Sequence, residues 1–214
     1  MRALIGCEFS GVVRDAFHRQ GWEAWSCDLL PTDAEGNHLE GDIFEALSFG
    51  KWDIIILFPP CTCLCLSGNR WYGRGMPNYW KRLQSANWTR ELWDKARSVC
   101  DHVAIENPMG VLPKLVKMEY SQRIQPYEYG HAEQKTTCLW LHNLPCLEPT
   151  NNVREEMQRL PMKEQQRVHR LPPSADRWKQ RSKTYQGVAD AMAFQWTQFV
   201  WPPAIRDGLS LEKS

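Results

Sequence analysis

Residues 54–61 read Ile-Ile-Ile-Leu-Phe-Pro-Pro-Cys, an unbroken apolar run that stops at two prolines. A strand with one face in water alternates apolar and polar residues, whereas a run without alternation is typical of a central parallel strand covered on both faces. Proline has no N–H for a neighbouring strand, so the two prolines end the strand. The segment therefore predicts a parallel sheet buried between helices, with Cys61 just beyond a strand end.

Strands and helices are expected to alternate on both sides of this run. Apolar segments predict strands at 2–6, 22–27, 102–106 and 135–141, and apolar spacing predicts helices at 12–20, 89–101 and 185–199. Residues 64–88 predict a long loop with room for a helical turn, and residues 146–180 predict irregular or weakly helical structure. This alternation indicates an α/β fold in one domain spanning 1–214, a Rossmann-like, mostly parallel sheet with helices on both faces.

Composition narrows the class of protein. The chain has 214 residues, 43% apolar and 24% charged, which suits one folded domain with a sizeable core. Its formal net charge of +1 provides no global attraction to a polyanion, so nucleic-acid binding requires a local basic patch. It contains no run of about 18 apolar residues and opens on a predicted strand, so we expect a cytoplasmic protein without a membrane partner. The eight cysteines are expected to be reduced, because a chain of this size and pattern needs no disulfides.

Polar or glycine-containing segments fall near the predicted carboxyl ends of strands, where open α/β sheets bind ligands. They are the loop Glu8-Phe9-Ser10-Gly11, Asp28, the pair Asp42-Ile43, and Pro59. Gly11 allows close approach of the backbone to a ligand, and Asp28 is placed to accept hydrogen bonds from ribose hydroxyls. Asp42-Ile43 is placed to pair with an adenine amino group and pack against its face. Because the loop lacks the full G-x-G-x-x-G fingerprint, these features favour S-adenosylmethionine over a dinucleotide.

The succession of motifs along the chain resembles the cytosine-5 DNA methyltransferases, particularly their short, phage-encoded type. The resemblance rests on Phe9-Ser10-Gly11, Asp28, Asp42, Pro60-Cys61, Ser67-Gly68 and Glu106-Asn107. It covers roughly residues 1–145, and residues 182–196 are similar to the family's closing motif. The resemblance implies a Rossmann-like S-adenosylmethionine-dependent methyltransferase, with S-adenosylmethionine as cofactor and cytosine in DNA as substrate. A phage origin would place the protein in the host cytoplasm.

The expected chemistry requires a thiol and a carboxylic acid. C5 of cytosine is too weak a nucleophile to attack a sulfonium methyl, but addition of a Cys61 thiolate at C6 converts the ring to a reactive enamine. Glu106 is expected to protonate or hydrogen-bond N3, and Asn107 to fix the local geometry. The run Phe58-Pro59-Pro60-Cys61 half matches the Asp/Asn-Pro-Pro-aromatic signature of amino-methyltransferases. That alternative is weak, because both functional positions of the signature are replaced.

Two departures from the family leave the substrate open. Arginines that hold the pyrimidine oxygen are absent from residues 133–139, where Lys135 is the one cation, so Lys135 or Thr136 is expected to take that role. A target-recognition domain is reduced to a short variable basic segment at about 146–180. Sequence-specific readout of duplex DNA needs several base-edge contacts. The substrate is therefore DNA read minimally, or a free cytidine or deoxycytidine nucleotide.

The expected catalytic loop, at about residues 61–88, interleaves cations with aromatic rings. Such a pattern suits a phosphate backbone with an unstacked base, and the predicted contacts are Ser67, Arg70, Trp71, Tyr72 and Arg74. Two alternatives remain: a lid whose aromatic rings pack onto the domain, and a non-catalytic relative that binds nucleic acid through this loop. The remaining cysteines and histidines lack the tight spacing of a zinc site, so no metal is expected. The sequence does not specify an oligomeric state.

Overall fold

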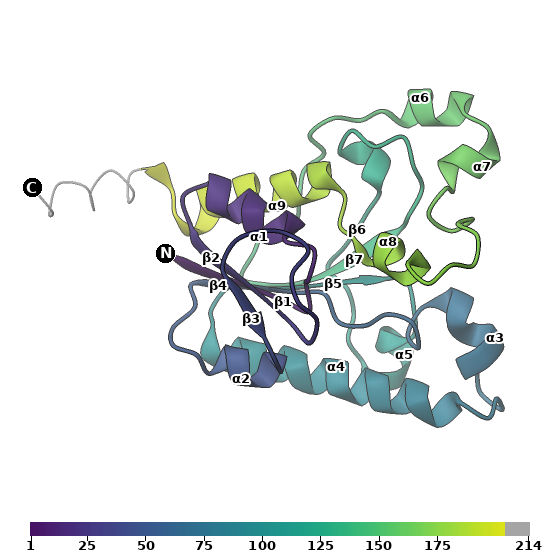
Figure 1. Cartoon of the computed structure of the whole chain (residues 1–214), viewed down its shortest axis with the longest axis horizontal. Helices are drawn as coiled ribbons and strands as arrows, with labels where there is room; N and C mark the ends of the chain where they lie inside the picture. The colour runs from purple at the N-terminus through teal and green to yellow at the C-terminus, as the bar shows by residue number, and fades with distance from the viewer. Residues whose placement is uncertain (204–214) are drawn as a thin grey trace, which may run out of the picture.

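The computed structural model describes residues 1–203, which form a seven-stranded sheet with helices on both faces (Figure 1). The strands are β1 (Arg2–Gly6), β2 (Glu23–Asp28), β3 (His38–Glu40), β4 (Ile54–Leu57), β5 (Val103–Pro108), β6 (Gln122–Ile124) and β7 (Thr137–His142). Their order in the sheet is β3-β2-β1-β4-β5-β7-β6. Strands β1 to β5 are parallel, whereas β7 runs antiparallel to both β5 and β6. The predicted mostly parallel, Rossmann-like sheet is confirmed.

The helices form a layer on each side of this sheet. They are α1 (Val12–Arg19), α2 (Ile43–Leu47), α3 (Asn69–Tyr72), α4 (Tyr79–Val99), α5 (Leu112–Val116), α6 (Arg154–Arg159), α7 (Met162–Gln165), α8 (Arg177–Ser182) and α9 (Gln186–Val200). Helices α1 and α9 cover one face, and α2 and α4 cover the other (Figure 1). In the described part of the chain, no helix has the length and hydropathy to cross a membrane.

The central strand β4 explains why its sequence lacks alternation. Ile54 and Ile56 pack in the core beneath α1 and α9, whereas Ile55 and Leu57 pack in the second core, against α2 and α4. All four side chains are fully buried. A strand with an apolar layer on each face needs apolar residues at every position.

The largest difference from the sequence-based expectation is the start of α4. The helix begins at Tyr79, whereas residues up to 88 were expected in a loop. Its buried stripe includes Arg82, Ala86 and Thr89, and the two polar members conceal the apolar periodicity in the sequence. The segment between β4 and α4 is therefore 58–78, and it contains a 3-10 turn (Leu66–Gly68) and α3. The three short helices α6, α7 and α8 agree with the weak helicity predicted for residues 146–180.

Two aromatic residues on α9 offer a matched test of the core. Trp196 is 0% exposed, and its indole N–H donates to the Pro145 carbonyl at 3.1 Å, whereas Phe194 is 53% exposed. We expect Trp196→Ala to lower the free energy of unfolding by about 3–5 kcal/mol, because it removes a buried aromatic side chain. Phe194→Ala should change it by about 0.5 kcal/mol or less. Urea denaturation measures both, and equal losses would contradict the assigned burial of α9.

Candidate active site

The direction of β7 brings chemically active residues from distant parts of the chain to one sheet edge. The parallel strands β1, β2, β4 and β5 all end at this edge, with Gly6 paired to both Cys27 and Leu57. Because β7 is antiparallel, its first residue, Thr137, pairs with Pro108 at the end of β5. Lys135 and the turn that carries Cys61 therefore lie at the same edge as Glu106.

The thiol of Cys61 lies in a partly buried position after β4. Burial and the negative charge of Glu106 raise the pKa of Cys61 to about 11, while Lys135 and Arg181 act in the opposite direction. The thiol is therefore neutral near pH 7 in the ligand-free protein. Its electrostatic neighbours are the residues expected to act on a pyrimidine, so the structure brings Cys61, Glu106 and Lys135 together.

Glu106 faces a small cavity beside Cys61. The residues that line it come from β5, from the region between the end of β6 and the start of β7, and from the region between the end of α8 and the first turn of α9, namely Glu106, Ile124, Pro126, Lys135, Thr137, Ser182, Thr184, Tyr185 and Val188. Burial raises the pKa of Glu106, opposed by Lys135 and Thr137, so its protonated form persists to higher pH than that of an exposed glutamate. The volume of about 20 Å³ holds little more than one water molecule. A pyrimidine therefore enters only if part of this lining moves.

Asn107 ties β5 to the turn that carries the thiol. Its side chain is buried, and its Nδ2 donates to the Pro59 carbonyl at 2.8 Å. Its Oδ1 is buried and has no hydrogen-bond partner among the residues that the structure describes. Pro59, predicted as a cofactor contact, thus serves at least to anchor the turn through its backbone.

Arg82, which sequence reasoning missed, fixes the loop after Cys61. Its buried guanidinium donates to the Cys63 carbonyl at 2.6 Å, the Cys65 carbonyl at 3.2 Å and the Asn69 Oδ1 at 2.7 Å. Gly110 lies so close on the other side that a Cβ there would be 2.2 Å from the Leu64 carbonyl oxygen. The loop is therefore pinned between α4 and the end of β5. In the sequence, the only sign that Arg82 is buried is its helical spacing from the other buried residues of α4.

Thr136 and Thr137 point to different surroundings. The Thr136 hydroxyl accepts a hydrogen bond from Gln125 Nε2 at 2.7 Å, whereas Thr137 lines the cavity with Glu106. Lys135 Nζ donates to the Arg181 carbonyl at 2.9 Å. Of the two residues predicted to hold a pyrimidine oxygen, the structure brings Lys135 to the cavity and leaves Thr136 outside its lining.

The predicted cofactor residues occupy the ends of β1, β2 and β3. Gly11 has φ of 74° at the start of α1, a left-handed conformation that favours glycine. Asp28 is the last residue of β2, and burial raises the pKa of its carboxyl group. Asp42 caps α2 by accepting a hydrogen bond from the Phe44 N–H at 2.8 Å. The Ile43 side chain is buried in the core, and its contact with an adenine face stays a prediction.

Glu8, the first residue of the loop expected at the cofactor end, is a further candidate to which the sequence assigned no role of its own. Its Oε1 accepts hydrogen bonds from Ser10 Oγ at 2.6 Å and from the Val13 N–H at 3.4 Å, at the start of α1. Its Oε2 is buried and unpaired within residues 1–203. Burial raises the pKa of this carboxyl group, and a positively charged ligand group would compensate. A glutamate beside a Phe-x-Gly loop was the available sequence signal.

Helix α8 lies against the loop that contains Phe9. The Trp178 ring lies 5.6 Å from the ring of Phe9, measured between centroids. Lys183 Nζ lies 2.9 Å from a carboxylate oxygen of Asp33, in the segment that follows β2. The stretch from Trp178 to Tyr185 thus reaches the predicted cofactor end of the sheet as well as the cavity beside Glu106.

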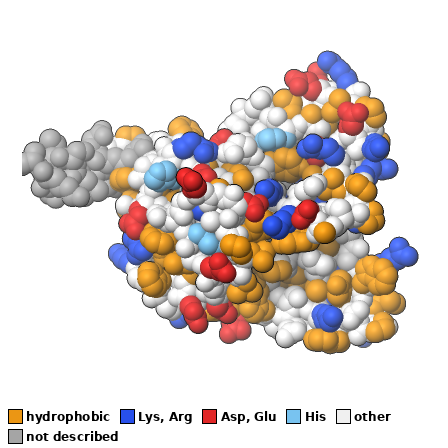
Figure 2. Space-filling model, viewed as in Figure 1, with side chains coloured by type: hydrophobic (Ala, Val, Ile, Leu, Met, Phe, Trp, Pro, Cys, Tyr) orange, Lys and Arg blue, Asp and Glu red, His pale blue; other side chains and the backbone are white. Residues whose placement is uncertain are grey.

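The predicted nucleic-acid contacts cluster on α3 and the turn after it. Trp71 is 61% exposed, with the Arg70 guanidinium 5.5 Å from its ring centre. Ser67 Oγ lies 3.1 Å from Cys65 Sγ, and Arg74 is exposed. Hydrophobic side chains gather over α3 and the start of α4 at the lower right of Figure 2. The exposure of Trp71 argues against a lid whose aromatic rings pack onto the domain, although Tyr72 is partly buried.

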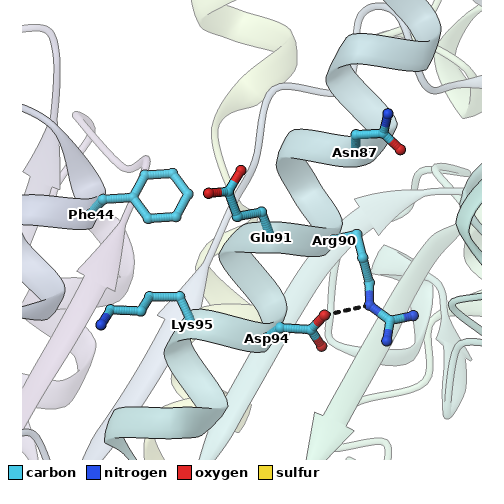
Figure 3. A pocket seen from close by; sticks show the side chains of 6 residues that line it. All are labelled: Phe44, Asn87, Arg90, Glu91, Asp94 and Lys95. Carbon is cyan, nitrogen blue, oxygen red and sulfur yellow. Dashed lines mark hydrogen bonds and ion pairs between the residues drawn. The ribbon is translucent and has the colours of Figure 1, made fainter.

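A second, open groove lies between α2 and α4, and Figure 3 shows its lining. Phe44 faces the α4 side chains, among which Arg90 and Asp94 form an ion pair at 2.7 Å. No predicted site residue lines this groove. Over residues 1–203, no three or more His, Cys, Asp or Glu side chains are grouped to hold a metal ion.

Comparisons with known proteins show that the chain is similar to some solved structures in fold. No family model and no curated protein matches the chain. Among solved structures, the bifunctional kinase-methyltransferase WbdD is 12% identical with a TM-score of 0.43, over 68% of this chain and 35% of that one. The Entamoeba histolytica methyltransferase EhMeth is 13% identical with a TM-score of 0.43, over 71% and 57%. An rRNA methylase from Escherichia coli is 13% identical with a TM-score of 0.35, over 66% and 57%.

The chain spans between 35% and 57% of the length of these three structures. The class of fold follows from the strand order β3-β2-β1-β4-β5-β7-β6 with β7 reversed. This is a Rossmann-like α/β fold with one reversed strand beside β5.

Arg82 and its neighbour Lys81 form a matched pair for testing the loop. Arg82→Met removes three hydrogen bonds to the segment after Cys61, whereas Lys81 is exposed. We expect limited proteolysis within residues 62–78 to become about tenfold faster in Arg82→Met, because local opening costs less. Lys81→Met should leave the rate within about twofold of the original. Equal rates in the two variants would contradict the anchoring role of Arg82.

The raised pKa of Cys61 predicts a steep pH dependence of its alkylation. Since the pKa is about 11, the thiolate fraction, and with it the rate, should rise about tenfold per pH unit between pH 8 and 10. Neutral iodoacetamide with site-resolved mass spectrometry measures this rate, and the exposed thiol of Cys146 provides an internal comparison. A Cys61 profile that levels off near pH 8.5 would show that the thiol is not shielded.

Proposed function

We propose that the protein is an S-adenosylmethionine-dependent methyltransferase that methylates C5 of cytosine in DNA through a Cys61 adduct at C6. The observation that carries the proposal is the convergence of Cys61, Glu106 and Lys135 at one sheet edge. A thiol, a carboxyl group with raised pKa and a cation are the groups that addition to a pyrimidine requires. The Rossmann-like sheet with β7 reversed is typical of S-adenosylmethionine-dependent methyltransferases and so supports methyl transfer as the reaction.

The residues at the ends of β1 and β2 fit the cofactor. Buried Glu8 Oε2, which lacks a partner within residues 1–203, can accept from the amino group of S-adenosylmethionine. Asp28 is placed to accept from the ribose hydroxyls, and Gly11 allows close approach of the loop. When bound, S-adenosylmethionine supplies a methyl group on a positively charged sulfonium, whose charge favours the thiolate form of Cys61.

The chain's own residues account for the addition step. The Cys61 thiolate forms a bond from Sγ to C6, and the displaced electron pair is stabilised when Glu106 places its proton at N3. C5 then forms a bond to the methyl carbon as the bond between that carbon and the sulfonium sulfur breaks, which releases S-adenosylhomocysteine, and the N3 proton returns to Glu106. Loss of the C5 proton to a base, with cleavage of the Sγ–C6 bond, restores the aromatic ring and the thiolate. Lys135 is placed to stabilise negative charge on the pyrimidine oxygen, and Asn107 keeps the thiol-bearing turn against β5.

Two observations favour different forms of the substrate. Exposed Trp71 with Arg70 beside it supports DNA with an unstacked base. The near-neutral charge and the short segment 146–180 support the alternative, a free cytidine or deoxycytidine nucleotide. A non-catalytic relative that binds nucleic acid through Arg70 and Trp71 is the third possibility.

Transfer of label from S-adenosylmethionine separates these proposals. Duplex DNA, single-stranded DNA, RNA and cytosine nucleotides are offered in parallel to the original protein and to Cys61→Ser. We expect label in DNA, and a loss of about 10³-fold or more in Cys61→Ser, because a hydroxyl is a far weaker nucleophile than a thiolate. Cofactor affinity, measured by calorimetry, should be similar in both proteins and so controls for misfolding.

The other outcomes are equally specific. Label in nucleotides alone would replace DNA with the alternative substrate. Label in DNA that survives in Cys61→Ser would refute the covalent mechanism. Absence of label from every substrate, with DNA retarded on a gel, would favour the non-catalytic relative.

A further inference from the structure

The side chain of Lys135 is held from two directions by the segment that leads into α9. Its Nζ donates to the Arg181 carbonyl at 2.9 Å, and its ammonium lies 5.7 Å from the centre of the Tyr185 ring. The face of an aromatic ring attracts a cation at such a distance. Lysine has a long, flexible side chain, so these two contacts restrict where its charge lies.

Tyr185 is itself held by a buried carboxylate. Its hydroxyl donates to Glu133 Oε2 at 2.9 Å, and Glu133 is 8% exposed. The other oxygen of Glu133 accepts from Arg167 Nε at 3.1 Å. The His131 ring lies 5.0 Å from the Tyr185 ring, and its Nε2 accepts from the Gly187 N–H at 2.9 Å. The orientation of the Tyr185 ring is therefore fixed by Glu133 and His131, which are held in turn by Arg167 and by the Gly187 N–H.

The ammonium of Lys135, which these contacts hold in place, acts on both proposed catalytic groups, Glu106 and Cys61. Lys135 and Tyr185 line the same cavity as Glu106. The ammonium of Lys135 lowers the pKa of both Glu106 and Cys61, in opposition to burial. Displacement of Lys135 by a few ångströms would therefore change the protonation of the thiol and of the acid together, because Coulomb energies in a partly dry site are large.

We propose that Tyr185 is a positioning residue, which through its ring and its bond to Glu133 holds the Lys135 ammonium at the cavity beside Glu106 and Cys61. The proposal rests on the proposed function for its catalytic meaning. The positioning itself is independent of methyl transfer, and it is measured on the protein without substrate. Tyr185 touches neither reacting atoms nor cofactor in this role, so it acts through Lys135.

A double-mutant cycle on the alkylation of Cys61 tests the proposal. Neutral iodoacetamide is used at pH 8 with site-resolved mass spectrometry on the full chain. Lys135→Met should slow alkylation of Cys61 about threefold to tenfold, because a stabilising positive charge is lost. Tyr185→Leu should slow it in the same direction by up to the same factor. The double variant should be no slower than Lys135→Met alone, because Tyr185 acts through the lysine charge.

Further variants exclude a general loss of structure. Tyr185→Phe keeps the ring and loses only the bond to Glu133, so it should fold normally and show a smaller slowing; Glu133→Gln should do the same. Arg97→Met removes a similar cation–aromatic pair, in which Arg97 lies 5.4 Å from the Trp93 ring, and should leave Cys61 alkylation within about twofold.

The outcomes distinguish this proposal from the proposed function. Additive effects of Lys135→Met and Tyr185→Leu, or unchanged alkylation in both Tyr185→Leu and Tyr185→Phe, would overturn the positioning role. A nonadditive cycle supports it even if no substrate accepts label. Label transfer with an additive cycle would leave the methyltransferase proposal standing without Tyr185.

Discussion

The antiparallel pairing of β7 with β5 is the constraint on which the candidate site depends. If β7 were parallel to β5, its amino end, with Lys135 and Thr137, would lie at the opposite edge of the sheet from Cys61. The reversed strand instead pairs Thr137 with Pro108 and brings these side chains to the carboxyl ends of the parallel strands. Strands β1 to β4 carry the proposed cofactor residues and the thiol, and β5 and β7 carry the acid and the cation. The site is therefore a product of sheet topology.

Sequence patterns predicted the features that depend on local order. The apolar run of β4 identified a buried parallel strand, and the Pro-Pro-Cys segment identified where it ends. Strand ends along the chain were sufficient to select Asp28 and the Pro-Pro-Cys61 segment, because parallel strands share one carboxyl edge, whereas Glu106 was selected through the family resemblance. The direction of β7 was not part of that expectation, yet it places Lys135.

Features that depend on long-range partners escaped sequence reasoning. Buried Arg82 looks like an exposed polar residue until its acceptors, the Cys63 and Cys65 carbonyls, are known, and this concealed the first turns of α4. Tyr185 was expected only as the start of a helix, since its bond to Glu133 joins residues 52 positions apart. The burial of Ile43 in the core at the start of α2 was likewise not part of the expectation. Hydrogen bonds between distant residues leave no periodic signal.

Burial has opposite consequences for the two proposed catalytic groups. It raises the pKa of Glu106, which keeps the proton that N3 of a pyrimidine needs, and it raises the pKa of Cys61, which suppresses the thiolate that must attack C6. Burial in one site therefore favours the protonated form of Glu106 and disfavours the thiolate form of Cys61. Positive charge resolves this conflict only if it lies near enough to the thiol, and Lys135 and Arg181 both act on it in that direction. A sulfonium bound at the neighbouring strand ends would add to them.

The segment from Trp178 to Tyr185 joins the two halves of the site. Its first residue packs on Phe9 at the cofactor end, Lys183 pairs with Asp33, and the Arg181 carbonyl holds Lys135 at the cavity. The same segment contributes lining to a cavity too small for a pyrimidine, so its displacement is the most direct way to admit one. Such a displacement would release Lys135 and uncover the Phe9 loop together. One short stretch of chain therefore contacts both the cavity that a pyrimidine must enter and the lysine whose charge favours the Cys61 thiolate.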